Sequence, residues 1–396
     1  MKTPLTIIVT GYAATYPFGG VAWDYLQYVV GFKRLGHDVY YLEDTSKWMY
    51  DPFEETFSDN PRYNVNYLAE TLAAFRCGLE DRWCIRDVHG NYWGLSHNAL
   101  AEVCKKSDLF LNLSGSCFLR EEYLKSALKI YLDSDPLYSQ AAIVDYVAGT
   151  DDSHIHWLID HMRLHDFFFS FGENIGKPGC SVPSDLFEWR PTRQPIMLSS
   201  WPHYRGQSRD LLTTVMSWQP AEEGPVVRGI SYGGKHMEFE KFLDLPERTS
   251  QRLELAIGGG KPPLNLLREK GWRVVNGYTH SSDLWKYRHY ILTSKGEFSV
   301  AKNAYVATRS GWFSCRSACY LAAGKPVIVQ ETGFSDILPT GYGILAFSTP
   351  EEAIEGIEAV NRDYARHSAA AREIAEEYFD SDKVLRKLLR DIGLEG

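Results

Sequence analysis

The residues that could bind a phosphate lie in a short stretch of the second half of the chain. The stretch 308–317, TRSGWFSCRS, combines the small residues Gly311 and Ser314 with the cation of Arg316. Small residues let a backbone approach a ligand closely, and a guanidinium forks onto phosphate oxygens. The following residues are typical of a helix, whose N-terminus attracts anions. We therefore predict that Gly311, Ser314 and Arg316 bind a diphosphate, the alternative being a solvated arginine on a helix.

Two lysines in neighbouring loops could add positive charge to the same site. Lys235 lies in the glycine loop SYGGKHMEF, and Lys302 lies in GEFSVAKNAY, directly before the proposed phosphate site. Preorganised cations stabilise the charge that develops on a departing diphosphate without a metal ion. The alternative is that both are solvated surface lysines. We rank Lys302 above Lys235.

Polar residues at the ends of two predicted strands could bind the remaining parts of a nucleotide ligand that carries this diphosphate. Glu331, Thr332 and Gly333 follow the apolar run KPVIV, and Glu331 could bind sugar or ribose hydroxyl groups. Tyr278 follows WRVVNG, where it could stack on a base, although a core tyrosine explains it equally well. Loops at the carboxyl ends of parallel strands line the ligand sites of α/β proteins.

A base that activates an acceptor hydroxyl is expected in the first half of the chain. Asp135 in DSDP and Glu173 in FGEN each follow an apolar run, and a carboxylate is a usual general base. An Asx turn or a helix cap is the alternative for Asp135. Gly19 and Gly20 predict a loop that approaches the donor or acceptor closely, which any tight turn would also do.

The sequence gives little support for a metal site or for a nucleic-acid partner. His154 and His156 in DDSHIHW have no third well-spaced ligand, and the seven cysteines are scattered, so we predict no metal site and reduced thiols. The formal net charge is −9 and no dense basic run occurs, which disfavours a nucleic-acid partner. No segment has the length of a membrane span or a signal peptide, so we expect a cytoplasmic protein.

The elements that must position these residues alternate between apolar strands and amphipathic helices. Strands are predicted at 4–10, HDVYYLED, 108–115, 128–136, 166–174, 211–218, 252–260, 272–278, 287–294 and 325–333. This pattern predicts an α/β protein with two Rossmann-like domains. We place a Pro- and Arg-rich linker at 188–210 and interpret 45–97 as helices and loops inserted over the mouth of the cleft.

The segments SACYLAAGKPVIVQETGFS, AREIAEEYFDSDKVLRKLL and PFGGVAWDYLQYVVGFKRLGHDVYYLED resemble the group 1 family of GT-B glycosyltransferases. The resemblance implies two Rossmann-like domains facing across a cleft, with C-terminal helices crossing back to the first. We expect an acceptor domain at 1–200, a nucleotide-sugar donor domain at 201–375 and a returning helix at 376–396. Many members carry two glutamates eight positions apart, but here the equivalent positions hold Gly311 and Cys319.

The resemblance implies a metal-independent transferase of the EC 2.4 class that needs no cofactor. Its co-substrate would be a nucleotide-diphosphate sugar, by default a UDP-sugar, and its acceptor a small molecule, natural-product scaffold or glycan with a free hydroxyl. An epimerase of the same fold and a non-catalytic nucleotide-sugar-binding protein are the alternatives. On this basis Arg316→Ala is expected to weaken binding of a nucleoside diphosphate and to leave the fold intact.

Overall fold

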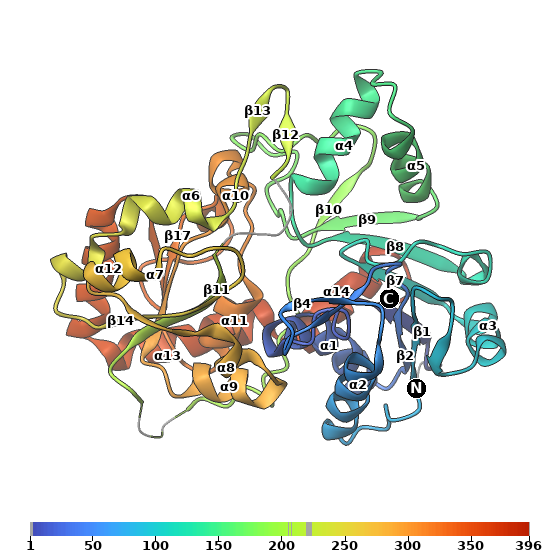
Figure 1. The fold of residues 1–396 in the computed structure, drawn as a ribbon, viewed down its shortest axis with the longest axis horizontal. Helices are drawn as coiled ribbons and strands as arrows, with labels where there is room; N and C mark the ends of the chain where they lie inside the picture. The colour runs from blue at the N-terminus through green and yellow to red at the C-terminus, as the bar shows by residue number, and fades with distance from the viewer. Residues whose placement is uncertain (1–2, 205, 207, 219–223, 396) are drawn as a thin grey trace.

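Two sheets, one from each half of the chain, organise the computed structural model (Figure 1). The structure describes residues 3–204, 206, 208–218 and 224–395. The first sheet has eight strands in the order β10-β9-β8-β7-β1-β2-β5-β6, and the second has six in the order β15-β14-β11-β16-β17-β18. Arg205 and Gln207 of the predicted linker lie outside the described residues.

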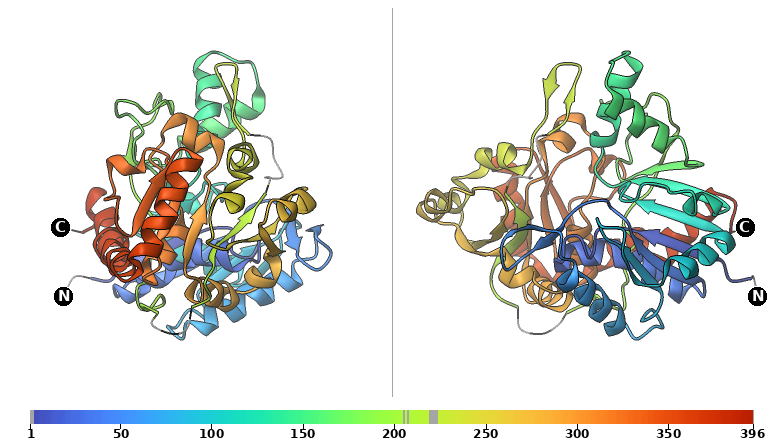
Figure 2. Two further views of the ribbon diagram at one scale, coloured as in Figure 1. Left: turned by 90° about the vertical axis from the view of Figure 1, so that its left-hand side faces the viewer. Right: turned by 45° about the vertical axis from the view of Figure 1, so that its right-hand side comes forward.

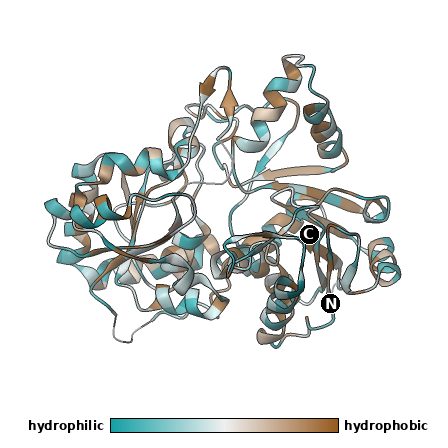
Figure 3. Cartoon of the chain, in the orientation of Figure 1, coloured by the Kyte–Doolittle hydropathy of each residue, from teal (hydrophilic) through white to brown (hydrophobic). Residues whose placement is uncertain are grey.

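The first sheet is parallel except for its last strand, β6, which pairs antiparallel with β5. Its strands are β1 (Thr6–Thr10), β2 (Asp38–Glu43), β5 (Trp83–Arg86), β6 (Tyr92–Gly94), β7 (Leu109–Leu113), β8 (Leu128–Asp133), β9 (Phe167–Ser170) and β10 (Trp189–Pro191). The surrounding elements are α1 (Gly19–Arg34), the hairpin β3 (Met49–Asp51) and β4 (Thr56–Ser58), α2 (Arg62–Ala74), α3 (His97–Lys106), α4 (Tyr138–Val147) and α5 (Ser153–Met162). The central strands are apolar on both faces, as a parallel sheet covered by helices requires (Figure 3).

The second sheet is entirely parallel. Its strands are β11 (Leu212–Ser217), β14 (Leu253–Gly258), β15 (Arg273–Asn276), β16 (Gly296–Ser299), β17 (Val327–Gln330) and β18 (Ile344–Phe347). The helices are α6 (Lys235–Phe239), α7 (Leu264–Glu269), α8 (Gly277–Ser281), α9 (Leu284–Leu292), α10 (Asn303–Thr308), α11 (Cys315–Ala322), α12 (Pro350–Arg362) and α13 (Tyr364–Ile374). A short hairpin, β12 (Val226–Val227) and β13 (Ile230–Ser231), leaves this domain and contacts α4 of the first (Figure 2).

Two predictions about secondary structure are wrong. Of the segment 287–294, predicted as a strand, the residues up to Leu292 belong to helix α9. The Asp283 carboxylate caps this helix by accepting hydrogen bonds from the Trp285 and Lys286 amides. The strand of this region is β16 instead. The segment 45–97, interpreted as helices and loops, contributes β5 and β6 to the first sheet.

The end of the chain returns to the first domain. A π-helical turn over Ala375–Phe379 is followed by Asp380 and by helix α14 (Ser381–Asp391), which packs on α1 (Figure 1). The contact is so close that a Cβ on Gly31 would lie 2.5 Å from Leu385 Cδ1. No helix among the described residues has the length and apolar character of a membrane span.

One hydrophobic cluster continues from the first domain into the second. It includes Trp23 and Phe32 of the first domain together with Leu284, Tyr287 and Phe313 of the second. The indole nitrogen of Trp23 donates to the Leu284 carbonyl at 3.0 Å. The two domains are therefore held by a shared apolar core as well as by polar contacts.

Asn174, after β9, links the first domain to two glycines of the second. Its backbone N–H donates to the Ser310 carbonyl at 3.0 Å, and its side-chain amide donates to the Gly333 carbonyl at 2.8 Å. At Gly311 an added Cβ would lie 2.9 Å from the Asn174 nitrogen. Glycine is therefore required at 311 by the approach of the other domain.

Substituting Gly311 tests how much this contact contributes to the closed arrangement. Gly311 and Gly149 have nearly the same left-handed conformation, with φ of 79° and 78°, but an added Cβ meets Asn174 at 311 and nothing within 4 Å at 149. Gly149→Ala should therefore lower the free energy of unfolding by about 1 kcal/mol, the cost of the backbone conformation. Gly311→Ala should lower it further and should increase the radius of gyration in small-angle scattering. Equal losses in the two variants would contradict the importance of this contact.

Candidate functional site

The carboxyl ends of the two sheets meet at the domain interface, where Asp135 of the first domain binds two residues of the second. Its carboxylate accepts a hydrogen bond from Lys302 Nζ at 2.7 Å and another from the Tyr305 hydroxyl. The neighbouring Ser134 carbonyl accepts from the Trp312 indole at 3.1 Å. The structure thus joins Asp135 and Lys302, which were predicted separately as a base and a phosphate-binding cation.

Arg316 lies at the start of α11 in a buried ion pair. Its Nε donates to Glu297 of β16 at 2.5 Å, and its two terminal nitrogens donate to the Val215 carbonyl at 2.9 Å and to Ser299 Oγ at 2.5 Å. A guanidinium has five N–H donors, so these three bonds leave two for a ligand. Removing Arg316 would leave Glu297 buried and unpaired, which is strongly destabilising. The expectation that Arg316→Ala leaves the fold intact is therefore replaced by one of a weakened fold.

Lys235, the first residue of α6, is the unpaired cation of this group. Its ammonium has no hydrogen bond or ion pair with any residue in the part of the chain that the structure describes. Burial, and then repulsion by the charges of Arg316 and Lys302, lowers the pKa of Lys235 well below its ordinary value. The three predicted cations therefore lie close together, and one of them, Lys235, has no partner among the described residues.

The start of α11 presents unused donors beside these cations. Ser314 is the N-cap residue, and its hydroxyl makes no capping bond. The first-turn amides of Cys315, Arg316 and Ser317 have no carbonyl partner among the described residues. They border a small pocket of about 20 Å³ lined by Ser299, Ser314, Arg316, Ser317, Gln330 and Thr332, among others. A helix N-terminus with free amides is suited to an anion.

Four other predicted donor-site residues bind one another or their immediate neighbours. The Gly311 amide donates to the Thr332 carbonyl at 2.7 Å, and the Thr332 hydroxyl donates to the Trp312 carbonyl at 2.5 Å. The Gly333 amide donates to the Glu331 carboxylate. These bonds hold the loops on either side of α11 and β17 together. In this arrangement the Gly311 amide and the Thr332 hydroxyl do not face a ligand as free donors.

The remaining predicted residues do not lie beside the cations Lys235, Lys302 and Arg316. Gly19 and Gly20 pack against α9, where a Cβ on Gly19 would lie 2.4 Å from the Asp283 carbonyl oxygen. The ring of Tyr278 lies 6.2 Å from that of Phe18, within an aromatic cluster of the first domain.

Glu173 also lies apart from the cations. Its carboxylate is buried in an ion pair with Arg193 at 2.6 Å, and the guanidinium of Arg193 lies over the rings of Tyr378 and Phe379. Burial raises the pKa of Glu173, and Arg193 opposes that effect. The ion pair of Glu173 and Arg193 therefore lies against Tyr378 and Phe379 of the C-terminal segment. Glu173 does not face the cations.

Asp24, on α1, is a residue that the sequence prediction missed. Its carboxylate accepts a hydrogen bond from the Cys315 thiol, while its Oδ1 is buried without a partner among the described residues. Burial, together with the nearby charge of Asp135 and against the effect of the Cys315 bond, raises the pKa of Asp24 to about 6. A carboxyl group with a pKa near neutrality can act as a general base or acid. Its signal in the sequence is an acidic residue within the otherwise apolar run VAWDYL.

No protein-family model and no curated protein matches this chain in sequence. Solved structures match over nearly its whole length. AviGT4, a glycosyltransferase involved in avilamycin A biosynthesis, has 12% identity, covers 98% of this chain and 97% of its own, and gives a TM-score of 0.55. The Anabaena HepE complex with UDP-glucose has 12% identity, covers 98% and 99%, and gives 0.54. The α-glucosyltransferase AGT in complex with UDP has 11% identity, covers 98% and 99%, and gives 0.53.

These matches confirm the fold that the sequence predicted. The chain has the GT-B fold, with two Rossmann-like domains facing each other through the carboxyl ends of their sheets. The neighbours are glycosyltransferases, and two of those named were solved with UDP or a UDP-sugar. At 11–13% identity the likeness shows the fold and leaves the chemistry to the residues of this chain. Within the described ranges, no group of three His, Cys, Asp or Glu side chains could hold a metal ion.

The raised pKa of Asp24 makes a prediction about stability. Because its folded-state pKa of about 6 exceeds the ordinary value of 3.8, the folded protein loses stability as pH rises through this window. Asp24→Asn removes that loss, so at pH 7 it should raise the free energy of unfolding by up to about 3 kcal/mol. Denaturation at several pH values measures this, and the gain should shrink towards pH 4.

The control for this prediction is Asp185→Asn, a substitution at an exposed position. It should leave the pH dependence unchanged. Asp133, whose pKa burial also raises to about 6, stays in every variant and keeps its own contribution. A loss of stability in Asp24→Asn at pH 7 would show that the carboxylate is held by contacts that an amide cannot replace.

Proposed function

We propose that the protein is a glycosyltransferase that moves a sugar from a nucleotide-diphosphate sugar to a hydroxyl group of an acceptor. The observation that carries this proposal is the unpaired ammonium of Lys235 beside Arg316 and Lys302. The GT-B fold and the nucleotide-bound neighbours agree with it.

The charges at the interface favour an anionic ligand. Arg316 is neutralised by Glu297, and Lys302 by Asp135. Lys235 forms no ion pair of its own with any described residue, and it lies beside the cations of Arg316 and Lys302. A diphosphate would supply the missing negative charge and the hydrogen-bond acceptors. The neighbours solved with UDP make a UDP-sugar the first donor to test.

The transfer can be assigned to residues on the two sides of the interface. The bond between the sugar and the diphosphate breaks, and the leaving diphosphate is stabilised by Lys235, by the free N–H groups of Arg316 and by the start of α11. A new bond forms between the sugar and the acceptor oxygen, whose proton passes to a carboxylate. Asp24 and Asp135 are the acidic groups on the first-domain side. Asp24 is the better base because Asp135 already accepts two hydrogen bonds.

Donor entry requires the domains to separate. The pocket at the start of α11 has a volume of about 20 Å³, enough for a water molecule but not for a nucleotide sugar. The contacts that must open include the pair between Asp135 and Lys302 and the bonds of Asn174. Domain closure over a substrate is a common step in transferases of two domains.

Lys235→Met tests the proposed diphosphate site. Loss of one charge-assisted hydrogen bond should weaken UDP binding by about 1.5–3 kcal/mol in calorimetry. A bound diphosphate also favours the charged form of Lys235, whose pKa is lowered, so UDP binding to the wild type should be accompanied by proton uptake. The variant should lose most of this uptake, which titration in buffers of different ionisation enthalpy would measure.

Lys261→Met is the matched control, because Lys261 is an exposed lysine of the same domain in the loop GGGKPP. It should bind UDP as the wild type does. Equal UDP affinity in Lys235→Met and Lys261→Met would remove Lys235 from the donor site.

Turnover separates transfer from the alternative activities. The protein is incubated with UDP-sugars and a panel of hydroxyl-bearing acceptors, and the released UDP and the products are measured. Release of UDP together with a glycosylated acceptor supports the proposal. A changed sugar without an acceptor would indicate an epimerase. Tight donor binding without turnover would indicate a binding protein.

A further inference from the structure

A second and larger pocket lies in the first domain, outside the group of cations. Its volume is about 560 Å³, and its main lining residues are Arg86, Tyr92, Phe118, Arg120, Trp157 and His161. They come from the carboxyl end of β5, from the start of β6, from the loop after β7 and from α5. The pocket therefore opens on the same edge of the first sheet as Asp135, but further along it.

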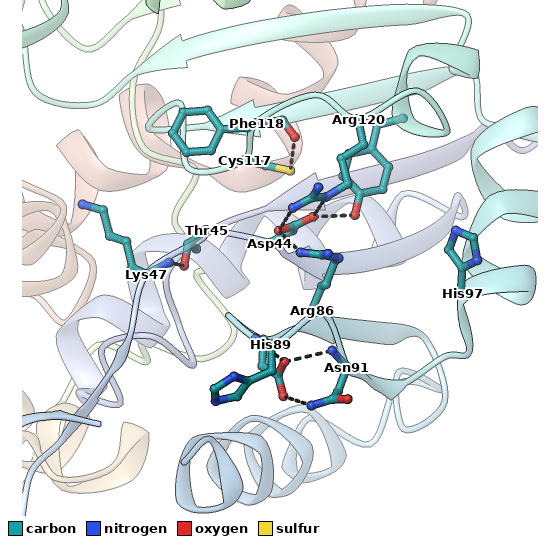
Figure 4. Close-up of polar contacts among 12 residues, drawn as sticks. Asp44, Thr45, Lys47, Arg86, His89, Asn91, His97, Cys117, Phe118 and Arg120 are labelled. Atoms are coloured by element: carbon teal, nitrogen blue, oxygen red, sulfur yellow. Dashed lines mark hydrogen bonds and ion pairs between the residues drawn. The ribbon is translucent and has the colours of Figure 1, made fainter. Parts of the chain in front are cut away.

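A buried carboxylate fixes the polar floor of this pocket. Asp44, only 1% exposed, follows β2 and accepts hydrogen bonds from Arg120 Nε at 2.5 Å and Nη2 at 3.1 Å (Figure 4). The Tyr123 hydroxyl donates to the same carboxylate at 2.8 Å, and Arg86 lies 3.8 Å away. Both guanidiniums are thus held in place before any ligand arrives, while parts of them stay exposed. Preorganised donors of this kind bind a ligand without paying for ordering.

Aromatic rings form the wall of the pocket. Trp157 on α5 is 38% exposed, and its ring lies 4.6 Å from that of Phe118 and 4.0 Å from that of His161. A large exposed indole beside hydrogen-bonding groups is a stacking platform, because one side of a sugar ring presents C–H bonds while its edge carries hydroxyl groups.

Charges of both signs surround the pocket. Arg86 and Arg120 face it together with Glu121 and Glu122. An anionic ligand would meet the glutamates, and a cationic ligand would meet the arginines. A neutral ligand with many hydroxyl groups can use both, because a hydroxyl donates to a carboxylate and accepts from a guanidinium.

The distance to Asp135 makes this pocket suited to the far end of a long ligand. In the sheet, β2 and β8 are separated by β1 and β7. Asp44, on the pocket floor at the end of β2, is thus three inter-strand steps of ~4.8 Å, about 14 Å, from the end of β8, whereas Phe118 and Arg120 follow β7, one step away. The pocket therefore extends away from Asp135 over more than the length of a single sugar ring.

Hydroxyl-bearing side chains lie between the two places. The Tyr12 ring contacts Lys47, the neighbour of the pocket residue Ser46, and its centroid lies 5.9 Å from that of Tyr25. Tyr25 is bonded to Ser114 at 2.8 Å, and Ser114 to Ser134, next to Asp135, at 2.6 Å.

We propose that this pocket binds the distal sugar rings of a neutral oligosaccharide acceptor, whose reacting end lies at Asp135 and Asp24. The acceptor class rests on the proposed glycosyltransferase function. Binding in the pocket does not, because its residues all belong to the first domain.

The test uses the full-length protein, without nucleotide, on a glycan microarray of neutral, carboxylated and sulfated oligosaccharides. Neutral oligosaccharides should bind, and longer members of a series should bind better than monosaccharides. For the best neutral ligand, titration should show about tenfold weaker binding by Trp157→Ala, and binding within about threefold of the wild type by Trp157→Phe, which keeps an aromatic face. Trp285→Ala, which removes a 43% exposed tryptophan of the second domain, should bind as the wild type does.

Three outcomes would overturn the proposal: no binding to any neutral oligosaccharide, binding confined to acidic ones, or equal affinity in wild type and Trp157→Ala. Circular dichroism and thermal unfolding of each variant confirm that the fold is intact. Because no nucleotide is present, failure of the donor experiments leaves this result unaffected. Oligosaccharide binding without sugar transfer would refute the proposed function and would still support the pocket as an oligosaccharide-binding site.

Discussion

The buried ion pair between Arg316 and Glu297 determines how the interface between the domains is organised. It fixes the first turn of α11 against β16 and β11, and the free amides of this turn border the small pocket at the start of the helix. This ion pair also neutralises one of the three cations at the interface, and the ion pair between Lys302 and Asp135 neutralises a second. What distinguishes the site is therefore Lys235, which has no ion-pair partner of its own among the described residues.

The fold could be predicted from local patterns where those patterns are strong. Continuous apolar runs ending in Gly, Asp or Ser gave β1, β7 and β17 at the expected places, since a strand buried on both faces needs such a run. The run at 287–292 is also apolar and aromatic, but the Asp283 cap makes it a helix, a choice that periodicity in a short segment does not decide. The strands β5 and β6 are only four and three residues long, too short for a clear periodicity, and their place in the sheet is set by the pairing of β5 with β2 and of β6 with β5.

The three cations and Asp135, which the structure brings together, were predicted from the sequence, but Asp24 was missed. Glycine loops and a helix start mark Lys235 and Arg316 in the sequence. Asp24 and the bond between Asp44 and Arg120 depend on contacts between residues far apart in the chain, 76 positions in the second case. The acidic residue within VAWDYL marks Asp24 as unusual, but no local pattern indicates its contact with Cys315 or the bond between Asp44 and Arg120.

The absent glutamate pair of the resembling family has a structural reason. At Gly311 the approach of Asn174 leaves no room for a side chain. Cys319 is fully buried and lies 3.9 Å from the side-chain amide of Gln27 on α1. Both positions therefore serve the packing of one domain on the other. Any contacts to the sugar and ribose of a donor must come from other residues.

Helix α14 has a consequence for how the chain is made. Its apolar residues Leu385, Leu388 and Leu389 are buried, and Leu385 fills the space above Gly31 on α1. During synthesis α1 leaves the ribosome among the first elements, but the helix that covers it follows only after more than three hundred further residues. The amino-terminal half therefore stays incomplete until translation is nearly over, and neither half is a natural unit for separate expression.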